Sequence, residues 1–332
     1  MTRTLSWLPS AWLAGAVAAA AAFVAVKAPR VAAIVPLRAS TSARPPDYRI
    51  RTDASVREAT DRDGRIVRMA RPVRGVVSQF WSIDEFVYTI VPPERVKGVS
   101  ESAYQARISN VLEHVRRYRP IIARDPEQVL LAEPDLVFVS SSARADYTAA
   151  VRSTGLSVFR MHTWFRTLEE VEQAIVVVGH LTGHEAAAAR ERALLREAIE
   201  RARRRRPAAT TPPRVLGLGG RYSYGSETLF HDILKTLGAV NVGAEGGLRG
   251  YDPVSSEQIA IWNPDWIVCG ADPGRLKERV AQLLSDPAIA VTAAGQSGRI
   301  LVFENRVFSA MSPYVRLFLD ALGAALYEQA AS

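Results

Sequence analysis

Two glutamates head a segment that occurs twice in the chain. Residues 127–139 read EQVLLAEPDLVFV, and residues 257–269 read EQIAIWNPDWIVC. If the fold brought Glu127 and Glu257 together, their carboxylates could bind a metal ion or share acid–base catalysis. The preceding residues indicate a different role, because Asp125-Pro126 and Ser255-Ser256 supply an N-cap and a first helical position. Each segment therefore predicts a short helix, a Pro-Asp turn and a buried strand.

Aromatic residues and arginines follow several of the predicted strands. Ligands of open α/β sheets bind beyond the carboxyl ends of the strands, and aromatic rings and guanidinium groups there suit a large, flat or acidic molecule. The alternative is that strand-to-helix loops carry such residues without binding anything. We expect a ligand site formed by Trp81, Tyr104, Ser141, Arg144, Trp164, Arg221, Tyr222, Tyr224, Arg249, Tyr251 and Phe308.

The signals for an enzyme are weak. Ser223 lacks the glycine two residues earlier that a nucleophile elbow needs. His180 and His184 have the helical spacing of a two-histidine metal site, but Gly183 weakens the helix between them. Cys269, the only cysteine, lies in an apolar strand and is most simply a core thiol. We therefore predict no enzyme, no cofactor and no metal site.

Short apolar runs alternate with amphipathic segments over most of the chain. This alternation predicts mostly parallel sheets covered by helices on both faces. Strands are expected at 64–69, 74–80, 96–100, 135–140, 156–161, 214–220, 265–270 and 299–305. Helices are expected at 82–91, 103–117, 126–133, 146–154, 227–238 and 313–330.

A run of helix-forming residues divides this pattern into two halves. Residues 167–207 are far longer than an ordinary globular helix, and Gly179 and Gly183 mark a weak point within them. The sequence thus predicts an α/β protein with two Rossmann-like lobes, joined by a single long backbone helix, with a ligand cleft between them. The expected divisions are a signal peptide or signal anchor (1–28), a linker ending in short strands (29–62), an N-terminal lobe (63–166), the backbone helix (167–207) and a C-terminal lobe (208–332).

Composition and charge restrict the location and the partners. Arg3 precedes an apolar run at 11–26, which is the order of an export signal, cleaved or retained as an anchor. The single cysteine allows no internal disulfide and leaves none for lipidation after the apolar run. The net charge of +8 favours an acidic ligand or surface, although much of it lies in RARRRRP at 201–207, which a solvated helix end explains without nucleic acid.

The order of several segments resembles the substrate-binding proteins of ABC importers for iron-siderophores, heme and cobalamin. The resemblance runs from about residue 60 to the C-terminus and includes DGRIVRMARPVRGVVSQFWSIDEFVYTI (63–90), STGLSVF, SETLFHDILKTLGAVNVGAEGG and the two repeated segments. It implies two lobes, a rigid helical backbone, a cleft and limited closure on binding. Departures such as VPPERV at 91–96, and Tyr314 where many members have arginine, bear on the ligand rather than on the fold.

The resemblance gives the repeated glutamates a role. In the importer complexes of that family, one surface glutamate of each lobe pairs with permease arginines, and Glu127 and Glu257 match those positions. Stabilisation of the helix dipole is the structural alternative, and one exposed carboxylate can do both. Glu85 differs, because Ser82 and Glu85 have the spacing of a capping box that would engage its carboxylate locally.

These observations predict a periplasmic, non-enzymatic receptor, free or anchored to the inner membrane by an uncleaved N-terminal segment. It would capture a metal chelate, a ferric siderophore or heme, and deliver it to an ABC permease as a monomer that binds no nucleic acid. The positive charge favours an acidic chelate over neutral cobalamin. The alternatives are a cobalamin-binding receptor of the same type and an anchored sensor or interaction module that uses the same fold.

Overall fold

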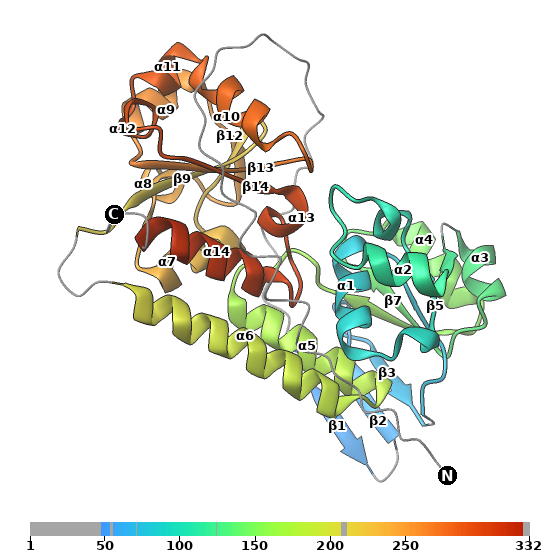
Figure 1. The fold of residues 1–332 in the computed structure, drawn as a ribbon. Coiled ribbons are helices and arrows are strands. Elements are labelled where there is room, and N and C mark those ends of the chain that lie inside the picture. The colour runs from blue at the N-terminus through green and yellow to red at the C-terminus, as the bar shows by residue number, and fades with distance from the viewer. Residues whose placement is uncertain (1–47, 54–55, 71, 124, 207–210, 328–332) are drawn as a thin grey trace, which may run out of the picture.

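The computed structural model describes residues 48–53, 56–70, 72–123, 125–206 and 211–327. Figure 1 shows two lobes standing on a pair of helices, α5 (Leu168–Thr182) and α6 (Glu185–Arg205). Each lobe contains its own β-sheet, and a third, small sheet lies near the N-terminal end of the described chain. The predicted α/β architecture with two lobes is confirmed. The predicted signal peptide or anchor at 1–28 lies outside the described residues.

The N-terminal lobe contains a five-stranded parallel sheet in the order β6-β5-β4-β7-β8. Its central strands are buried on both faces, as expected for a parallel sheet covered by helices. The helix predicted at 103–117 is wrong over its middle, because only its two ends are helical. The elements are β4 (Val76–Ser78), α1 (Trp81–Ile90), η1 (Pro93–Arg95), β5 (Val96–Val99), η2 (Glu101–Tyr104), α2 (Leu112–Tyr118), β6 (Ile121–Ile122), α3 (Pro126–Leu131), β7 (Leu136–Ser140), α4 (Ala145–Ser153) and β8 (Ser157–Met161).

The C-terminal lobe contains a mixed sheet. Strands β11, β9, β13 and β14 are parallel, whereas β10 and β12 extend the sheet as antiparallel strands. The elements are β9 (Arg214–Gly219), β10 (Tyr222–Tyr224), α7 (Leu229–Leu237), β11 (Val240–Asn241), α8 (Val242–Glu245), β12 (Tyr251–Pro253), α9 (Ser256–Trp262), β13 (Trp266–Ala271), α10 (Leu276–Leu284), α11 (Pro287–Ala290), α12 (Ala293–Gln296), β14 (Ile300–Glu304), α13 (Asn305–Phe308) and α14 (Val315–Tyr327).

The repeated segment forms the same unit in both lobes, α3 followed by β7 and α9 followed by β13. The predicted N-caps are present: the Asp125 carboxylate accepts a hydrogen bond from the Gln128 amide at 2.9 Å, and the Ser255 hydroxyl accepts one from the Gln258 amide at 3.2 Å. Each cap satisfies an amide that the first helical turn would otherwise leave unpaired. The sequence therefore determined this unit locally.

The Pro-Asp turn also has one structural role in both copies, which the sequence did not reveal. The Asp135 carboxylate accepts from the Gly75 amide at 2.9 Å, immediately before β4, and Asp265 accepts from the Arg214 amide at 2.9 Å, at the start of β9. The residue preceding each proline, Glu133 or Asn263, adopts a positive φ. These contacts fix each helix relative to the sheet of its lobe.

The segment predicted as one long backbone helix is a helical hairpin, so that prediction is wrong. Gly183 ends α5 with φ of 75°, a left-handed conformation that glycine adopts without strain, and α6 then runs back along α5. Arg192 and Arg196 of α6 both donate to the carboxylate of Glu172 in α5, at 3.0 and 2.8 Å. The break expected near the glycines is therefore a reversal of direction, and α6 alone connects the hairpin to the C-terminal lobe.

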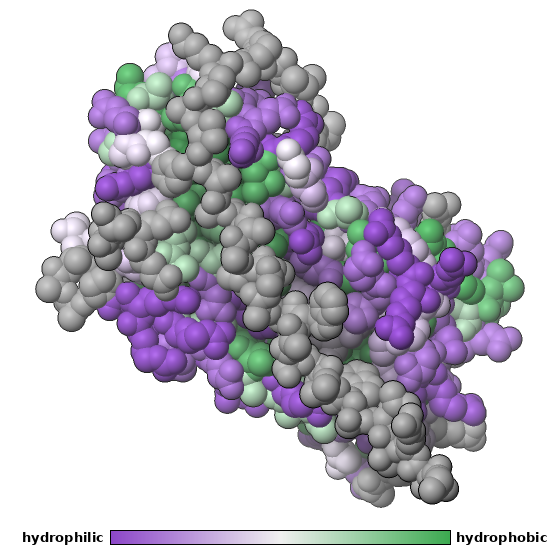
Figure 2. All heavy atoms as spheres, viewed as in Figure 1, coloured by the Kyte–Doolittle hydropathy of each residue, from purple (hydrophilic) through white to green (hydrophobic). Residues whose placement is uncertain are grey.

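The described part of the basic run, residues 201–206, forms the end of α6. Figure 2 shows hydrophilic side chains gathered over the C-terminal end of α6. Some of these arginines are paired within the protein: Arg203 with Glu200, and Arg201 and Arg205 with Asp320 of α14. The run therefore forms a solvated helix end that is partly neutralised by acidic neighbours, as the sequence indicated.

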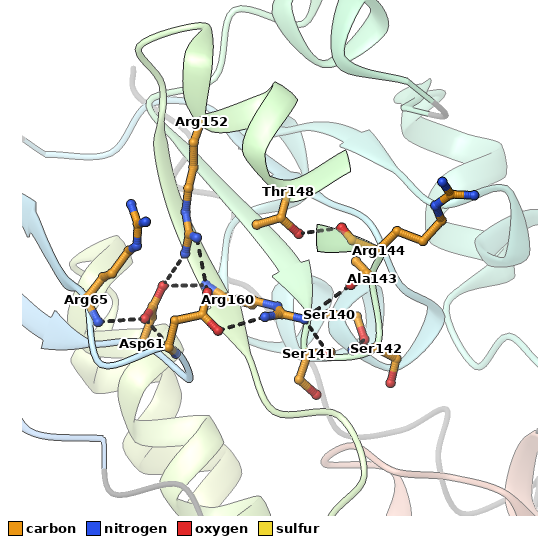
Figure 3. A network of polar contacts seen from close by, with 11 residues as sticks. Asp61, Arg65, Ser140, Ser141, Ser142, Ala143, Arg144, Thr148, Arg152 and Arg160 are labelled. Atoms are coloured by element: carbon orange, nitrogen blue, oxygen red, sulfur yellow. Dashed lines mark hydrogen bonds and ion pairs between the residues drawn. The ribbon is translucent and has the colours of Figure 1, made fainter. Parts of the chain in front are cut away.

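A small antiparallel sheet attaches to the N-terminal lobe. It consists of β1 (Ile50–Asp53), β2 (Val56–Thr60) and β3 (Ile66–Met69), so part of the segment predicted as a linker is ordered in strands. The side chain of Asp61 is fully buried, and its carboxylate forms an ion pair with the Arg152 guanidinium at 2.7 Å (Figure 3). Arg160 donates hydrogen bonds to the carbonyls of Ser141 and Ala143. This network joins the small sheet to α4 and β8.

One continuous cluster of buried apolar side chains extends through both lobes. It includes Val76 of β4, Ile83 of α1, Leu195 of α6, Leu234 of α7 and Phe318 of α14. Two smaller clusters lie on the other faces of the two sheets. Because α6 contributes to the shared cluster together with helices of both lobes, the lobes are held on a common apolar core.

Candidate functional site

The lobes meet at a small set of contacts that we call the lobe junction. It consists of Trp164, Arg166, Asn110 and Glu85 from the N-terminal side and of Tyr251, Glu227, Arg306 and Ser312 from the C-terminal side. Strand β8 leads into Trp164 and Arg166, and the antiparallel strand β12 begins at Tyr251. Residues far apart in the sequence, such as Glu85 and Ser312, which are 227 positions apart, thus come together here.

A chain of aromatic rings crosses the lobe junction. Trp164 lies edge-on to Tyr251 with ring centroids 5.8 Å apart, Tyr251 contacts Tyr224 at 5.4 Å, and Tyr224 contacts Phe308 at 5.5 Å. Edge-to-face contacts of this kind are favourable aromatic geometries. Burial raises the pKa of Tyr224 and of Tyr251, so both phenols are neutral at physiological pH. Four predicted site residues are therefore brought together.

A charged group lies beside these rings. Arg249 donates to the carboxylate of Glu227, whose second oxygen is 3.9 Å from Arg166 across the junction. The hydrogen bond from Arg249 lowers the pKa of Glu227, which is partly exposed and remains ionised. Sequence reasoning found Arg249 but missed Glu227, which has a positive φ directly before the N-cap of α7. An acidic ligand reaching Arg249 would have to compete with this internal carboxylate.

Other predicted site residues make contacts of their own. The Tyr104 hydroxyl donates to the carbonyls of Val115 and Pro120, and the exposed Arg144 pairs with Asp146. The Ser141 carbonyl accepts from Arg160, while its neighbour Ser142 accepts from the Trp164 indole at 2.5 Å.

The remaining predicted site residues differ in their exposure and packing. Trp81 packs against Phe80, Tyr222 is partly buried in β10, and Arg221 is exposed. Phe308 is buried and packs edge-to-face against Tyr224, Phe230 and Phe318.

Glu85 is the buried polar centre of the lobe junction. Its carboxylate accepts from the backbone and side-chain nitrogens of Asn110, each at 2.9 Å, and from the Ser312 hydroxyl at 2.5 Å. Asn110 also donates to the carbonyl of Arg306 at 2.7 Å. The predicted capping box is wrong: the N-cap of α1 is Phe80 without a side-chain hydrogen bond, and Glu85 instead links α1 to the C-terminal lobe.

Burial dominates the titration of this centre. It raises the pKa of Glu85 to about 7, against the opposing hydrogen bonds from Ser312 and Asn110. The adjacent Asp84 accepts hydrogen bonds from Ser78 and Ser100, and burial raises its pKa to about 8. The serine hydroxyls beside the two carboxyls, those of Ser78, Ser100 and Ser312, all donate hydrogen bonds to them. Glu85 connects the two lobes, whereas the partners of Asp84 lie within the N-terminal lobe.

The two predicted docking glutamates lie on different lobes. Both are exposed in the first turns of α3 and α9. Hydrogen bonds from the backbone amide of Glu257 itself and from the Ser255 side chain lower the pKa of Glu257. The idea that Glu127 and Glu257 form one catalytic or metal-binding pair is therefore wrong, because Figure 1 shows α3 and α9 far apart. Their arrangement suits contact with a partner.

The residues first considered for catalysis have structural contacts. Ser223 is buried and donates to the Gly217 carbonyl, and Cys269 is buried in β13. The His180 ring nitrogen lies 3.0 and 3.1 Å from the carbonyls of Arg51 and Glu58. Among the residues with described positions, no group of three or more His, Cys, Asp or Glu residues could hold a metal ion.

The comparison with known families decides the identity of this two-lobed architecture. The model of a family described as periplasmic binding protein matches residues 76–307, which is more than half of the chain. This chain belongs to the periplasmic binding protein family. The matched region contains both lobe sheets, the helical hairpin and every residue of the lobe junction except Ser312.

Individual relatives differ in their named ligands. The chain is 26% identical over 193 residues to a cobalamin-binding protein of Halobacterium salinarum, covering 57% of this chain and spanning about half, 52%, of that relative. It is similar in structure to the periplasmic heme-binding protein RhuT from Roseiflexus sp. RS-1, with a TM-score of 0.66, 26% identity, and coverage of 77% of this chain and 99% of that one.

The molybdate periplasmic binding protein MolA of Haemophilus influenzae shares the fold at a TM-score of 0.67 but at 16% identity, covering 82% of this chain and 92% of that one. The family and these neighbours are binding proteins. Within the described ranges, none of the helices combines the length and the apolar character needed to cross a membrane.

Proposed function

We propose that this protein is the solute-binding component of an ABC importer that captures a metal chelate at the lobe junction and delivers it to a permease. The chelate would be a ferric siderophore or heme. The observation that carries this proposal is the aromatic chain from Trp164 through Tyr251 and Tyr224 to Phe308, which crosses from one lobe to the other. The family match supports the transport role.

The chemistry of the junction suits a flat, acidic ligand. Aromatic edges and faces supply dispersion contacts to a conjugated ring or catecholate, and Arg249 supplies a cation within reach of the same rings. A carboxylate of the ligand could replace Glu227 as the partner of Arg249, so that binding exchanges one charge pair for another. We expect Trp81, Tyr222 and Arg221 to contact the ligand only if the two lobes move toward each other around it.

Cobalamin is the second candidate. The similarity to the cobalamin-binding protein of Halobacterium salinarum favours it, whereas the net charge of +8 favours an acidic chelate. A sensor or interaction module using the same fold remains the alternative to transport, and a neighbouring permease and ATPase gene would favour import. We place the protein in the periplasm, exported by the segment at 1–28, either released or retained at the inner membrane.

Ligand identity can be tested by tryptophan fluorescence and absorbance with the full chain. Heme, ferric siderophores and cobalamin would be titrated into wild type, Trp164→Phe and the control Trp262→Phe, whose indole lies at the end of α9. An acidic chelate should quench the wild type, and Trp164→Phe should lose more of the quenching than Trp262→Phe. Absence of binding to all three ligand classes would overturn the chelate proposal.

A charge variant separates the two ligand candidates. Arg249→Ala should weaken binding of an acidic chelate about tenfold, because it removes one charge-assisted hydrogen bond. The same variant should leave binding of neutral cobalamin nearly unchanged. Arg203→Ala, at the exposed end of α6, is the matched control for a general loss of positive charge. Tight cobalamin binding that is the same in wild type and Arg249→Ala would favour the second candidate.

Permease docking rests on Glu127 and Glu257. We expect Glu127→Lys combined with Glu257→Lys to abolish binding to the cognate permease in nanodiscs, since each lysine would oppose a permease cation. Ligand binding should be retained, because both residues lie outside the lobe junction. Unchanged permease binding and uptake by this double variant would remove the docking assignment.

A further inference from the structure

Trp164, the aromatic residue that contacts the other lobe from the N-terminal side, is held by a loop of its own lobe. Its indole nitrogen donates to the Ser142 hydroxyl at 2.5 Å. Ser142 is the middle residue of the segment 141–143 between β7 and α4, which we call the tryptophan loop. Because Trp164 is partly exposed, its ring is not fixed by packing alone, and this hydrogen bond restrains the ring that contacts Tyr251.

Arg160 of β8 holds the tryptophan loop by its backbone. The guanidinium donates to the carbonyl of Ser141 at 2.7 Å and to that of Ala143 at 3.2 Å, the two residues on either side of Ser142. Figure 3 shows the Arg160 side chain extending to these carbonyls. A guanidinium carries its N–H donors in a fixed plane, so one arginine can fix two carbonyl groups at once. The position of Ser142 therefore depends on Arg160.

The turn between β2 and β3 of the small sheet holds Arg160 from its other side. The carboxylate of Asp63 pairs with Arg160 at 2.7 Å and with Arg152 at 3.1 Å, and Arg152 pairs with Asp61 as well. The two arginines thus share one carboxylate, but they differ in their remaining side-chain contacts. Those of Arg160 lead to the tryptophan loop, whereas that of Arg152 leads back to the small sheet.

Hydroxyl groups hold the tryptophan loop from the side of the protein interior. The buried Ser140 hydroxyl accepts from the Ser142 amide at 3.0 Å and lies 2.8 Å from the hydroxyl of Thr163, which is also buried and directly precedes Trp164. These contacts do not involve Arg160. Loss of the Arg160 side chain should therefore shift the loop without unfolding it.

We propose that Arg160 is a positioning residue of the ligand site: it fixes the tryptophan loop and thereby, through Ser142, orients the Trp164 indole for contact with a flat ligand. This inference rests on the proposed function and deepens it, because it makes the small N-terminal sheet, which holds Arg160 through Asp63, part of the structure that sets ligand affinity. The described side-chain partners of Arg160 are Asp63 and the loop carbonyls, so its effect on a ligand is indirect.

The first measurement follows the indole N–H resonance of Trp164 in the ¹⁵N-labelled full chain without ligand, assigned with Trp164→Phe. Ser142→Ala should move this resonance and speed the exchange of the N–H with water, because the indole loses its acceptor. Ser142→Thr keeps the hydroxyl and should restore the wild-type position. Arg160→Ala should move the same resonance, although Arg160 has no hydrogen bond to Trp164 among its described contacts. Arg160→Lys keeps the charge but not the planar group, and should give a smaller shift.

Two control variants separate positioning from stability and charge. Arg152→Ala removes the other arginine of Asp63, so it should lower the stability but leave the Trp164 resonance in place. Arg65→Ala removes an exposed positive charge from the same turn and should change neither. In a double-mutant cycle, Arg160→Ala should add no shift to that of Ser142→Ala, because its effect passes through the Ser142 hydroxyl.

The second measurement is an absorbance titration with heme as the probe. Arg160→Ala and Ser142→Ala should each weaken heme binding about fivefold, the effect of one hydrogen bond, whereas Arg152→Ala should bind heme like wild type. Wild-type heme affinity in both of the first two variants would overturn the role of this arrangement in ligand binding.

The outcomes separate this inference from the proposed function. A Trp164 resonance that is unmoved in Arg160→Ala, an equal shift in Arg152→Ala, or additive shifts in the double-mutant cycle would overturn the positioning role, whatever the ligand. If the resonance responds as expected but wild type binds neither heme, ferric siderophores nor cobalamin, the proposed function fails and the orientation of Trp164 by Arg160 stands.

Discussion

Replacing Glu85 tests how far the attachment of the two lobes depends on one buried carboxylate. In Glu85→Ala, the nitrogens of Asn110 and the hydroxyl of Ser312 lose their acceptor. A buried donor left without a partner costs about 1–3 kcal/mol. Because three donors lose the same acceptor, Glu85→Ala should lower the free energy of unfolding by about 3–5 kcal/mol. Glu85→Gln keeps the shape of the side chain and should cost much less.

The same residue predicts a pH dependence of known sign. Burial raises the pKa of folded Glu85 to about 7 from 4.5, so the folded state holds a proton that the unfolded state has released. A carboxyl raised in this way destabilises the fold as the pH rises from its unfolded to its folded pKa. The difference corresponds to about 3 kcal/mol. Wild type should therefore lose stability between pH 5 and 7.5, and Glu85→Gln should lose less.

Urea unfolding followed by circular dichroism at pH 5, 6, 7 and 8 provides the measurement. Wild type, Glu85→Ala, Glu85→Gln and the control Glu113→Ala would be compared, since the Glu113 side chain is 84% exposed. Asp84→Asn separates the contribution of the neighbouring carboxyl, whose pKa burial raises to about 8. A loss below about 1 kcal/mol in Glu85→Ala, or an unchanged pH slope in Glu85→Gln, would refute the reasoning.

Three further predictions concern the elements that hold the site. Arg152→Ala leaves Asp61 buried without its cation and should cost about 3 kcal/mol in urea unfolding, whereas Arg144→Ala, which removes an exposed ion pair, should leave the urea midpoint unchanged; similar losses would contradict this account. Gly183→Ala, at φ of 75° between α5 and α6, should lower stability by about 1–2 kcal/mol, and an unchanged melting temperature would argue against the tight reversal. Gly225→Ala would place a Cβ against the Leu248 backbone, and should weaken ligand binding by displacing the loop that carries Arg249; wild-type affinity would show that the loop adapts.

Much of the fold could be predicted because its signals are local. Caps, turns and apolar periods predicted the longer parallel strands of both lobes and several of the helices, and the repeated segment predicted the same unit twice. The short strands β6, β10, β11 and β12 and the helix α10 were missed. The helix expected at 103–117 failed for a tertiary reason. Its middle residues instead deliver Asn110 to the carboxylate of Glu85, which a continuous helix would not allow at that position.

The candidate site was predicted only in part. Residue type indicates which side chains could contact a ligand, but it does not reveal which of them already form contacts within the protein. Trp164, Tyr224, Tyr251 and Phe308 come together as expected for residues at strand ends. Glu227 was missed, although its carboxylate accepts a hydrogen bond from Arg249. No sequence signal identifies a carboxylate that reaches an arginine 22 residues away through a loop.

The sequence by itself determined the local structure of this protein: two α/β halves, with a capped short helix, a Pro-Asp turn and a buried strand in each. These features depend on hydrogen bonds and spacings within a few residues. Only the tertiary structure decided that α5 and α6 form a hairpin and that Glu85 bonds to Ser312, 227 positions away. Such pairings depend on which buried polar groups the packed lobes bring within reach, and burial makes each of them satisfy the other.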